Sequence, residues 1–235
     1  MVHLDLEIKP PFFEIGPKAY MFGREVLDLA RRADSLSREY EVQVIFTPQA
    51  VDIPLIAHQV DAVLVFAQHM DSLRPGRGTG SILPEAVKAA GAAGVLLNHV
   101  EKRLSREELA RTIRRAVEVG LATMVCADDA EDAASVAALE PNVIIVEAPV
   151  LIAGGRRDDS GRLAIAAANE AIWRVNPAIR VLHGAGISGA QDVYDVIAAG
   201  AQGTGSSSAI FTANDPKAML ESMIRAVREA WDLTH

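Results

Sequence analysis

Short apolar runs rich in β-branched residues alternate with longer amphipathic segments along the whole chain. This alternation is typical of strand–helix units whose strands form a parallel sheet that is covered on both faces. It predicts eight strands, near residues 12–16, 41–47, 62–68, 93–98, 121–127, 143–147, 179–183 and 201–206. The first and eighth runs carry the weakest signals, because Pro10 and Pro11 crowd one while Gly203 and Gly205 interrupt the other.

The segments between these runs carry helix signals. Ser105 and Glu108 form a predicted capping box at the start of a helical pattern. Three glycines fall where helices are expected to end: Gly91, Gly120 and Gly200. Eight strand–helix units in 235 residues favour an α/β fold of the closed (β/α)8 barrel type over an open doubly wound sheet. No GxGxxG motif follows the first strand, which agrees with this choice.

The chain shows no internal boundary. No linker rich in Pro, Gly and Ser divides it, so we expect one barrel domain over residues 1–235. Residues 69–80 are rich in Gly and Pro and lie outside the regular alternation. We expect them to form a protruding loop.

Composition and charge limit the classes of partner. No apolar stretch approaches the length that spans a bilayer, and the N-terminus lacks a secretory signal, so we expect a cytoplasmic protein. A formal charge of -8 argues against nucleic-acid and membrane-surface partners, although a local site can still bind an anion. Cys126 is the only cysteine, which excludes an internal disulfide and is typical of a small buried hydrophobic residue.

The active site of such a barrel lies at the carboxyl ends of its strands. A lysine, a histidine and a glutamate at these ends can supply an anion anchor, an electrophile or acid, and a base. Glu147 ends the apolar run 143–146 and precedes a Gly-ended loop that can close over a ligand, which suits a base shielded from water. Taken alone, a carboxylate at a strand end is more often a surface charge. The polar and small residues at the predicted ends are Lys18, Gln68, His69, His99, Glu147, Gly184, Ala185, Gly186, Ser206, Ser207 and Ser208.

Several segments resemble the triosephosphate isomerase family, especially its shorter archaeal-type branch. They are residues 66–71 (FAQHMD), 78–88 (GTGSILPEAVK), 95–103 (VLLNHVEKR), 181–188 (VLHGAGIS) and the loop after Glu147. Each motif alone is weak evidence for the resemblance. Together they are strong evidence, because they occur in the family's order and at matching strand ends, from about residue 15 to the C-terminus.

The resemblance implies an isomerase that interconverts glyceraldehyde 3-phosphate and dihydroxyacetone phosphate, as in glycolysis and gluconeogenesis, through an enediol(ate). It assigns Glu147 as the base, His99 as the electrophile and Lys18 as the substrate-binding lysine, with Glu101 as the acidic residue two positions after the histidine. We expect no metal and no organic cofactor, since a carboxylate base and hydrogen-bond donors suffice for this chemistry.

The resemblance also implies a phosphate site and an assembly. The expected phosphate-binding residues are Ala153, Gly154, Gly184, Ala185, Gly186, Ser206, Ser207 and Ser208. The 69–80 loop is expected to dock into a second copy of the chain, with Thr79 as the matching threonine, in a dimer or a tetramer.

Four departures lie near the expected chemistry. Gly16 stands where the family has an asparagine, and the lost amide contact is worth on the order of 1 kcal/mol. Val100, Ala148 and Ala153 replace a serine, a proline and a glycine. Three alternatives therefore stay open: an isomerase of another sugar phosphate such as a tetrulose phosphate, a barrel that binds sugar phosphates without efficient turnover, and a phosphate-binding barrel lyase or epimerase.

Other histidines and tryptophans have structural interpretations. We expect His58 to be solvated or to pack on a helix, His69 to position the 69–80 loop, and His183 to be a hydrogen-bonded structural residue. Trp173 and Trp231 lie in helical patterns and are predicted to be packing residues.

Overall fold

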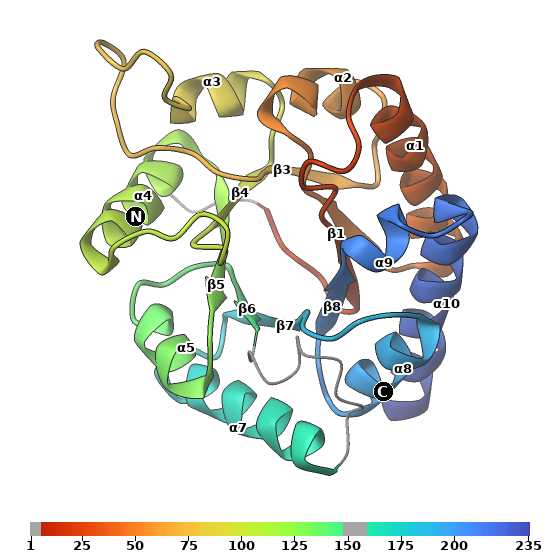
Figure 1. Ribbon diagram of the computed structural model, residues 1–235. Helices are drawn as coiled ribbons and strands as arrows, with labels where there is room; N and C mark the ends of the chain where they lie inside the picture. The colour runs from red at the N-terminus through yellow and green to blue at the C-terminus, as the bar shows by residue number, and fades with distance from the viewer. Residues whose placement is uncertain (1–5, 148–158) are drawn as a thin grey trace.

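A computed structural model describes residues 6–147 and 159–235 and contains a closed barrel of parallel strands in sequential order from β1 to β8 (Figure 1). Every strand falls inside a run that the sequence predicts, which confirms the predicted (β/α)8 barrel. The strands are β1 (Phe12–Ile15), β2 (Gln43–Phe46), β3 (Leu64–Ala67), β4 (Gly94–Leu97), β5 (Ala122–Ala127), β6 (Val143–Val146), β7 (Arg180–His183) and β8 (Gly203–Ser206).

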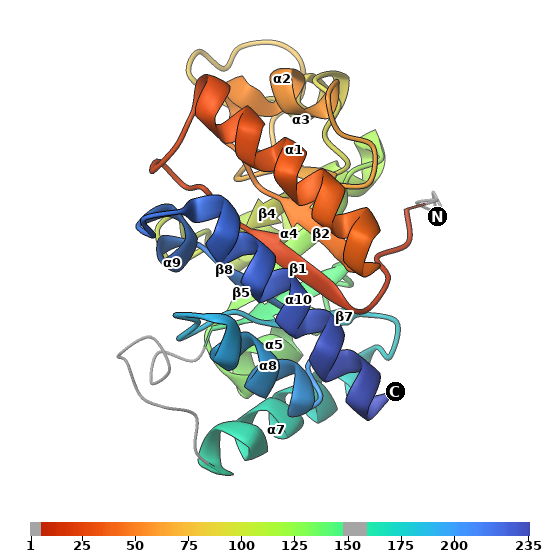
Figure 2. The ribbon, with the colours of Figure 1, turned by 90° about the vertical axis from the view of Figure 1, so that its right-hand side faces the viewer.

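Helices surround the barrel, and α10 packs against both α1 and α8 (Figure 2). Within the described residues these are α1 (Gly23–Tyr40), the 3-10 turn η1 (Ala50–Asp52), α2 (Ile53–Ala57), α3 (Pro84–Ala89), α4 (Arg106–Val119), α5 (Ala130–Ala137), α7 (Asp159–Val175), α8 (Ala190–Ala198), α9 (Ser208–Phe211) and α10 (Pro216–Thr234). None of the helices in this part of the chain is long and apolar enough to cross a membrane.

The helix termini agree largely with the sequence signals. Gly91, Gly120 and Gly200 adopt φ of 96°, 75° and 97°, the left-handed conformation expected just beyond a helix. Ser105 caps α4, since its side chain accepts a hydrogen bond from the Glu108 N–H at 3.2 Å. The Glu108 carboxylate accepts instead from Ser72 and Arg111, so the capping box forms only in its first half.

The hydrophobic core has two layers because the side chains of each strand alternate in direction. One layer fills the barrel interior, with Phe12, Phe66 and Met124 among its members. The other lies between strands and helices, and Trp173 and Trp231 pack against it as predicted. Cys126 is buried in the barrel interior, where burial raises the pKa of its thiol, in agreement with a small hydrophobic role.

The glycines that weaken the β8 sequence are explained by β1, its neighbour in the barrel. Gly203 pairs with Phe12, and a Cβ on Gly203 would lie 2.5 Å from the Phe12 ring. Gly205 pairs with Glu14, and a Cβ there would lie 2.9 Å from Glu14 Oε2. Both glycines therefore make room for large side chains of β1 that point into the barrel.

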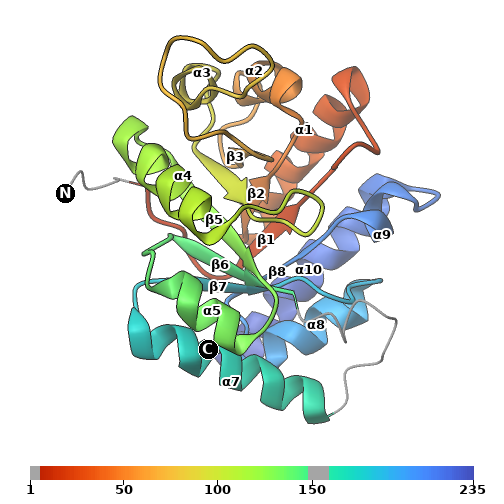
Figure 3. The same ribbon diagram turned by 60° about the vertical axis from the view of Figure 1, so that its left-hand side comes forward.

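The 69–80 segment contains no helix or strand and projects from the barrel (Figure 3). Its ends are held together at Asp71, whose N–H donates to the Ile82 carbonyl at 2.9 Å and whose Oδ2 accepts from the Ile82 N–H at 2.7 Å. Residues 74–81 are exposed.

Three residues attach the first part of this loop to α4. Ser72 donates to Glu108 Oε1 at 2.5 Å, the Leu73 carbonyl accepts from Arg115, and Arg74 forms an ion pair with Glu118 at 2.8 Å. The loop is thus fixed to the side of the helix that follows the His99 turn.

Candidate active site

A cavity of about 870 Å³ opens at the carboxyl ends of the strands. It is lined by most of the residues that the sequence proposes for the site: Lys18, Gln68, His69, His99, Glu101, Glu147, Gly184, Ala185, Gly186, Ser206, Ser207 and Ser208. The remaining proposed residues, Ala153 and Gly154, lie outside the described residues, as does Ala148.

Lys18 is held at the mouth by two other loops. Its Nζ lies 2.8 Å from Glu101 Oε1, and this hydrogen-bonded pair lowers the pKa of the Glu101 carboxyl. The Lys18 backbone has φ of 46°, a strained conformation for a residue with a side chain. Gln68 Nε2 stabilises it by donating to the carbonyl of Lys18 at 3.0 Å and to that of Thr47 at 2.9 Å.

The His99 ring is oriented by the backbone of its own turn. Its Nδ1 lies 3.1 Å from the Glu101 N–H and accepts from it, so the proton of the neutral ring is on Nε2. Burial is the main cause that lowers the pKa of His99; the charges of Lys18 and Arg103 also lower it, whereas Glu147 and Glu101 oppose the shift. His99 therefore presents an uncharged N–H donor to the cavity.

Asn98 fixes the turn that carries His99. Its φ is 60°, another left-handed residue with a side chain. The side-chain amide donates to the Cys126 carbonyl at 3.0 Å, and its oxygen accepts from the Leu104 N–H at 3.2 Å. These bonds tie the turn to β5 and to the residue before the N-cap of α4.

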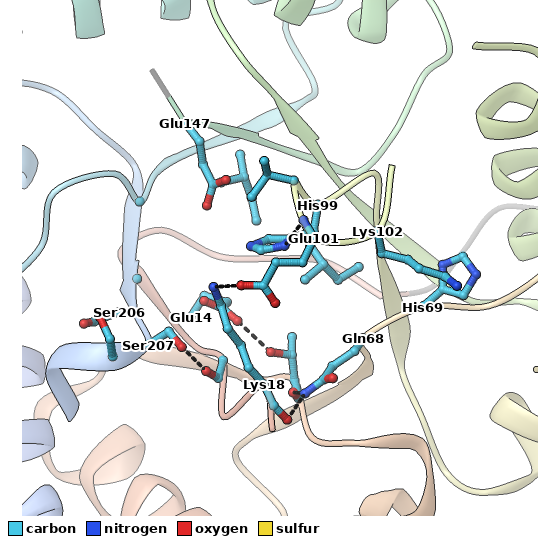
Figure 4. A pocket seen from close by; sticks show the side chains of 18 of the residues that line it. Glu14, Lys18, Gln68, His69, His99, Glu101, Lys102, Glu147, Ser206 and Ser207 are labelled. Atoms are coloured by element: carbon cyan, nitrogen blue, oxygen red, sulfur yellow. Dashed lines mark hydrogen bonds and ion pairs between the residues drawn. The ribbon is translucent and has the colours of Figure 1, made fainter. Parts of the chain in front are cut away.

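Glu147 directly follows β6. Its N–H donates to the Ala127 carbonyl at 2.9 Å, which continues the pairing of β6 with β5. The carboxylate extends into the cavity, on the opposite side from Lys18, with the His99 ring between them (Figure 4).

The two Gly- and Ser-rich segments lie together beside β7 and β8. Gly186 adopts φ of 74°. Ser207 Oγ donates to the Gly16 carbonyl at 2.6 Å, so this hydroxyl links β8 to the β1 loop. Ser206 Oγ is buried and has no hydrogen-bond partner among residues 6–147 and 159–235.

Sequence reasoning missed Glu14, a half-buried residue of β1 that also lines the cavity. Its Oε1 accepts a hydrogen bond from Thr47 Oγ1 at 2.7 Å. Burial raises the pKa of Glu14 to about 7; Thr47 and Lys18 oppose the shift, and the negative charge of Glu147 adds to it. The available signal was a lone carboxylate two residues after Phe12, and therefore on the inward face of an apolar strand.

Gly16 is directly connected with Glu14. A Cβ at position 16 would lie 3.0 Å from Glu14 Oε1 and 3.4 Å from Thr47 Oγ1. The carboxyl group of Glu14 therefore occupies the space into which a side chain at position 16 would extend.

The other histidines have the structural partners expected of them. His58 is exposed, with Nδ1 2.6 Å from the Pro54 carbonyl. His69 Nε2 lies 3.3 Å from Asp71 Oδ1, at the base of the 69–80 loop. His183 is buried, with Nε2 2.9 Å from Asn169 Oδ1.

A carboxylate, a neutral imidazole and a lysine in one barrel mouth define a class: a (β/α)8-barrel enzyme equipped for proton transfer next to a carbonyl group. The family model described as triosephosphate isomerase matches residues 15–227. The chain belongs to the triosephosphate isomerase family.

Individual relatives support membership of the same family over nearly the whole chain. Proteins named triosephosphate isomerase are 38% identical in Methanobacterium bryantii, 36% in Methanosarcina mazei and 36% in Sulfurisphaera tokodaii. The matches cover 94%, 92% and 96% of this chain, respectively, and 99% of each relative. The predicted family, its archaeal-type branch and the isomerase class are thereby confirmed.

Proposed function

We propose that this protein interconverts glyceraldehyde 3-phosphate and dihydroxyacetone phosphate. The observation that carries the proposal is the convergence of Glu147, His99 and Lys18 on one cavity, in a chain of the triosephosphate isomerase family. Neutral histidine and a carboxylate base are the arrangement described for this family.

Each group has a separate role in the proposed reaction. Glu147 takes a proton from the carbon next to the substrate carbonyl, and the same carboxyl returns it to the former carbonyl carbon. The hydroxyl proton moves to the former carbonyl oxygen, so that the carbonyl and hydroxyl groups exchange places. The Nε2–H of His99 and the ammonium group of Lys18 donate to the oxygen on which negative charge develops. Glu101 holds Lys18 in place.

The phosphate group is proposed to bind at the loops that follow β7 and β8. Backbone N–H groups of Gly- and Ser-rich segments bind anions without a charged side chain. The residues assigned to this role are Gly184, Ala185, Gly186, Ser206, Ser207 and Ser208, together with Ala153 and Gly154.

A coupled isomerase assay tests the assignment of the base. It compares glyceraldehyde 3-phosphate, dihydroxyacetone phosphate and both tetrulose phosphates as substrates of the wild-type protein and of Glu147→Gln. The substitution is expected to lower kcat by about a thousandfold or more on the preferred substrate. Glu39→Gln is the matched control, because Glu39 is an exposed residue in the last turn of α1. Equal rates for Glu147→Gln and the control would remove Glu147 from the mechanism.

A tetrulose phosphate is the second candidate substrate. It is favoured by one observation: Glu14 adds a carboxyl group to the cavity wall, which can bind a further hydroxyl group. A higher kcat/KM on a tetrulose phosphate than on both triose phosphates would establish this alternative. Tight binding of these compounds without turnover would instead establish a sugar-phosphate-binding barrel.

We also propose that the protein forms a homo-oligomer through the 69–80 loop. The tip of the loop is exposed, and large apolar side chains are exposed at the same end of the barrel: Tyr20 and Phe22 after β1, Val51 in η1 after β2, and Val100 after β4. Burial between two copies would remove this apolar surface from water. Sedimentation analysis is expected to show a dimer or tetramer that becomes monomeric when residues 75–79 are replaced by a short Gly-Ser link. An unchanged mass would exclude the loop as the contact.

A further inference from the structure

Glu14 places a second carboxyl group in the cavity, on the opposite side from Glu147 (Figure 4). Its Oε1 is fixed by Thr47 at 2.7 Å. Glycines flank it on both sides, since a Cβ at Gly16 would lie 3.0 Å from Oε1 and a Cβ at Gly205 would lie 2.9 Å from Oε2. The carboxyl thus occupies a space that these two glycines leave open for it.

Oε2 of this carboxyl is available to a ligand. Thr47 is the only hydrogen-bond partner of the Glu14 side chain within residues 6–147 and 159–235, and it contacts Oε1. Because the Glu14 side chain lines the cavity, its Oε2 stands where a substrate oxygen can reach it.

The protonation state decides what Glu14 can do. Besides Thr47, the groups that act on it are Glu147, which favours the neutral acid, and Lys18, which favours the carboxylate; Cys126 faces it from β5. Burial dominates and raises the pKa of Glu14 to about 7. A neutral Glu14 carboxyl can donate a hydrogen bond from its O–H group, whereas the carboxylate form can only accept one.

We propose that Glu14, as the neutral carboxylic acid, donates a hydrogen bond from Oε2 to an oxygen of the reacting end of the substrate. The inference rests on the isomerase function proposed above. Glu14 keeps its proton throughout the reaction, so it is a substrate-contacting residue that adds a donor to those of His99 and Lys18. It supplies the side-chain donor that Gly16 does not have.

The test compares Glu14→Ala and Glu14→Gln with the wild-type protein over pH 5.5 to 9 in the isomerase assay. Glu14→Ala removes the donor and is expected to lower kcat/KM by about 10- to 100-fold at pH 6. Glu14→Gln keeps a donor that cannot titrate, so its loss is expected to be smaller. The wild-type kcat/KM is expected to fall as pH rises through about 7, and this fall is expected to be absent in Glu14→Gln. Glu39→Gln serves as the control and is expected to keep the wild-type profile.

A purely structural role for Glu14 would not change the pH profile. An unchanged kcat/KM in Glu14→Ala, or the same alkaline fall in Glu14→Gln as in the wild type, overturns the inference. If either result occurs while Glu147→Gln is inactive, the proposed isomerase function stands and only the role of Glu14 fails. Absence of isomerase activity in the wild-type protein on all four sugar phosphates overturns both.

Discussion

Lys18 Nζ and Glu101 Oε1 lie 2.8 Å apart across the barrel mouth, although the two residues are 83 positions apart in the chain. The pair joins the loop after β1 to the loop after β4, which also carries His99. The ion pair therefore positions Lys18 relative to the loop that carries His99, the other group proposed to act on the substrate oxygen.

Glu101→Gln is expected to lower kcat/KM by about tenfold, because it loosens the position of Lys18 without removing the lysine charge. The pair is partly exposed, so thermal stability is expected to change little. Steady-state kinetics and a melting curve measure the two quantities, with the exposed Glu107→Gln as the control. Equal loss of activity and stability would indicate a folding defect and not a positioning role.

Gly16→Asn restores the family's residue in a site that no longer has room for it. The new side chain would begin 3.0 Å from Glu14 Oε1, so we expect a loss of about 1–3 kcal/mol in the free energy of unfolding. The double variant Glu14→Gly with Gly16→Asn is expected to recover most of it. Urea denaturation of the wild type, both single variants and the double variant measures this coupling. Additive effects would show that positions 14 and 16 do not compete for space.

The pKa of Glu14 makes stability depend on pH. The folded-state pKa of about 7 exceeds the ordinary value of 4.5, so ionisation of Glu14 is harder in the folded protein than in the unfolded chain. Below pH 4.5 the carboxyl is neutral in both states and costs no stability. As the pH rises from 4.5 through 7, the folded protein loses stability relative to the unfolded chain. Glu14→Gln cannot ionise. The free energy of unfolding of Glu14→Gln minus that of the wild type is therefore expected to be about 1–3 kcal/mol larger at pH 8 than at pH 5, as measured by urea unfolding. A difference that is the same at both pH values would show that Glu14 has an ordinary pKa.

Thr47→Val removes the hydrogen bond that favours the charged form of Glu14, so the pKa of Glu14 is expected to rise. The alkaline fall in kcat/KM should then move to higher pH by about half a unit to one unit. Thr234→Val, at the exposed end of α10, is the matched control. An alkaline fall that stays in place would mean that another group titrates there.

The barrel could be predicted from the sequence because buried parallel strands leave a local signal, the β-branched apolar run. β8 shows the limit of this reasoning. Gly203 and Gly205 have low strand propensity. Glycine is needed at these positions because the side chains of Phe12 and Glu14, almost 200 residues earlier in the chain, occupy the space that a Cβ would fill. Only the paired structure shows that these glycines accommodate large neighbours.

The candidate site was predictable where its residues stand at strand ends, as for His99 and Glu147, because barrel geometry brings such ends together. Glu14 lies inside β1, two residues before Gly16, which replaces the family's asparagine. It is therefore not among the strand-end residues from which the site was predicted. The sequence showed a missing amide at position 16 but not the carboxyl that fills the same space. Competition between side chains for one volume is a three-dimensional property.

The attachment of Ser72, Leu73 and Arg74 to α4 gives that helix two duties. Its first residues follow the turn that carries His99 and Glu101, and its flank supports the exposed 69–80 loop. α4 therefore connects the 69–80 loop on the outer surface of the molecule with the turn that carries His99 at the barrel mouth.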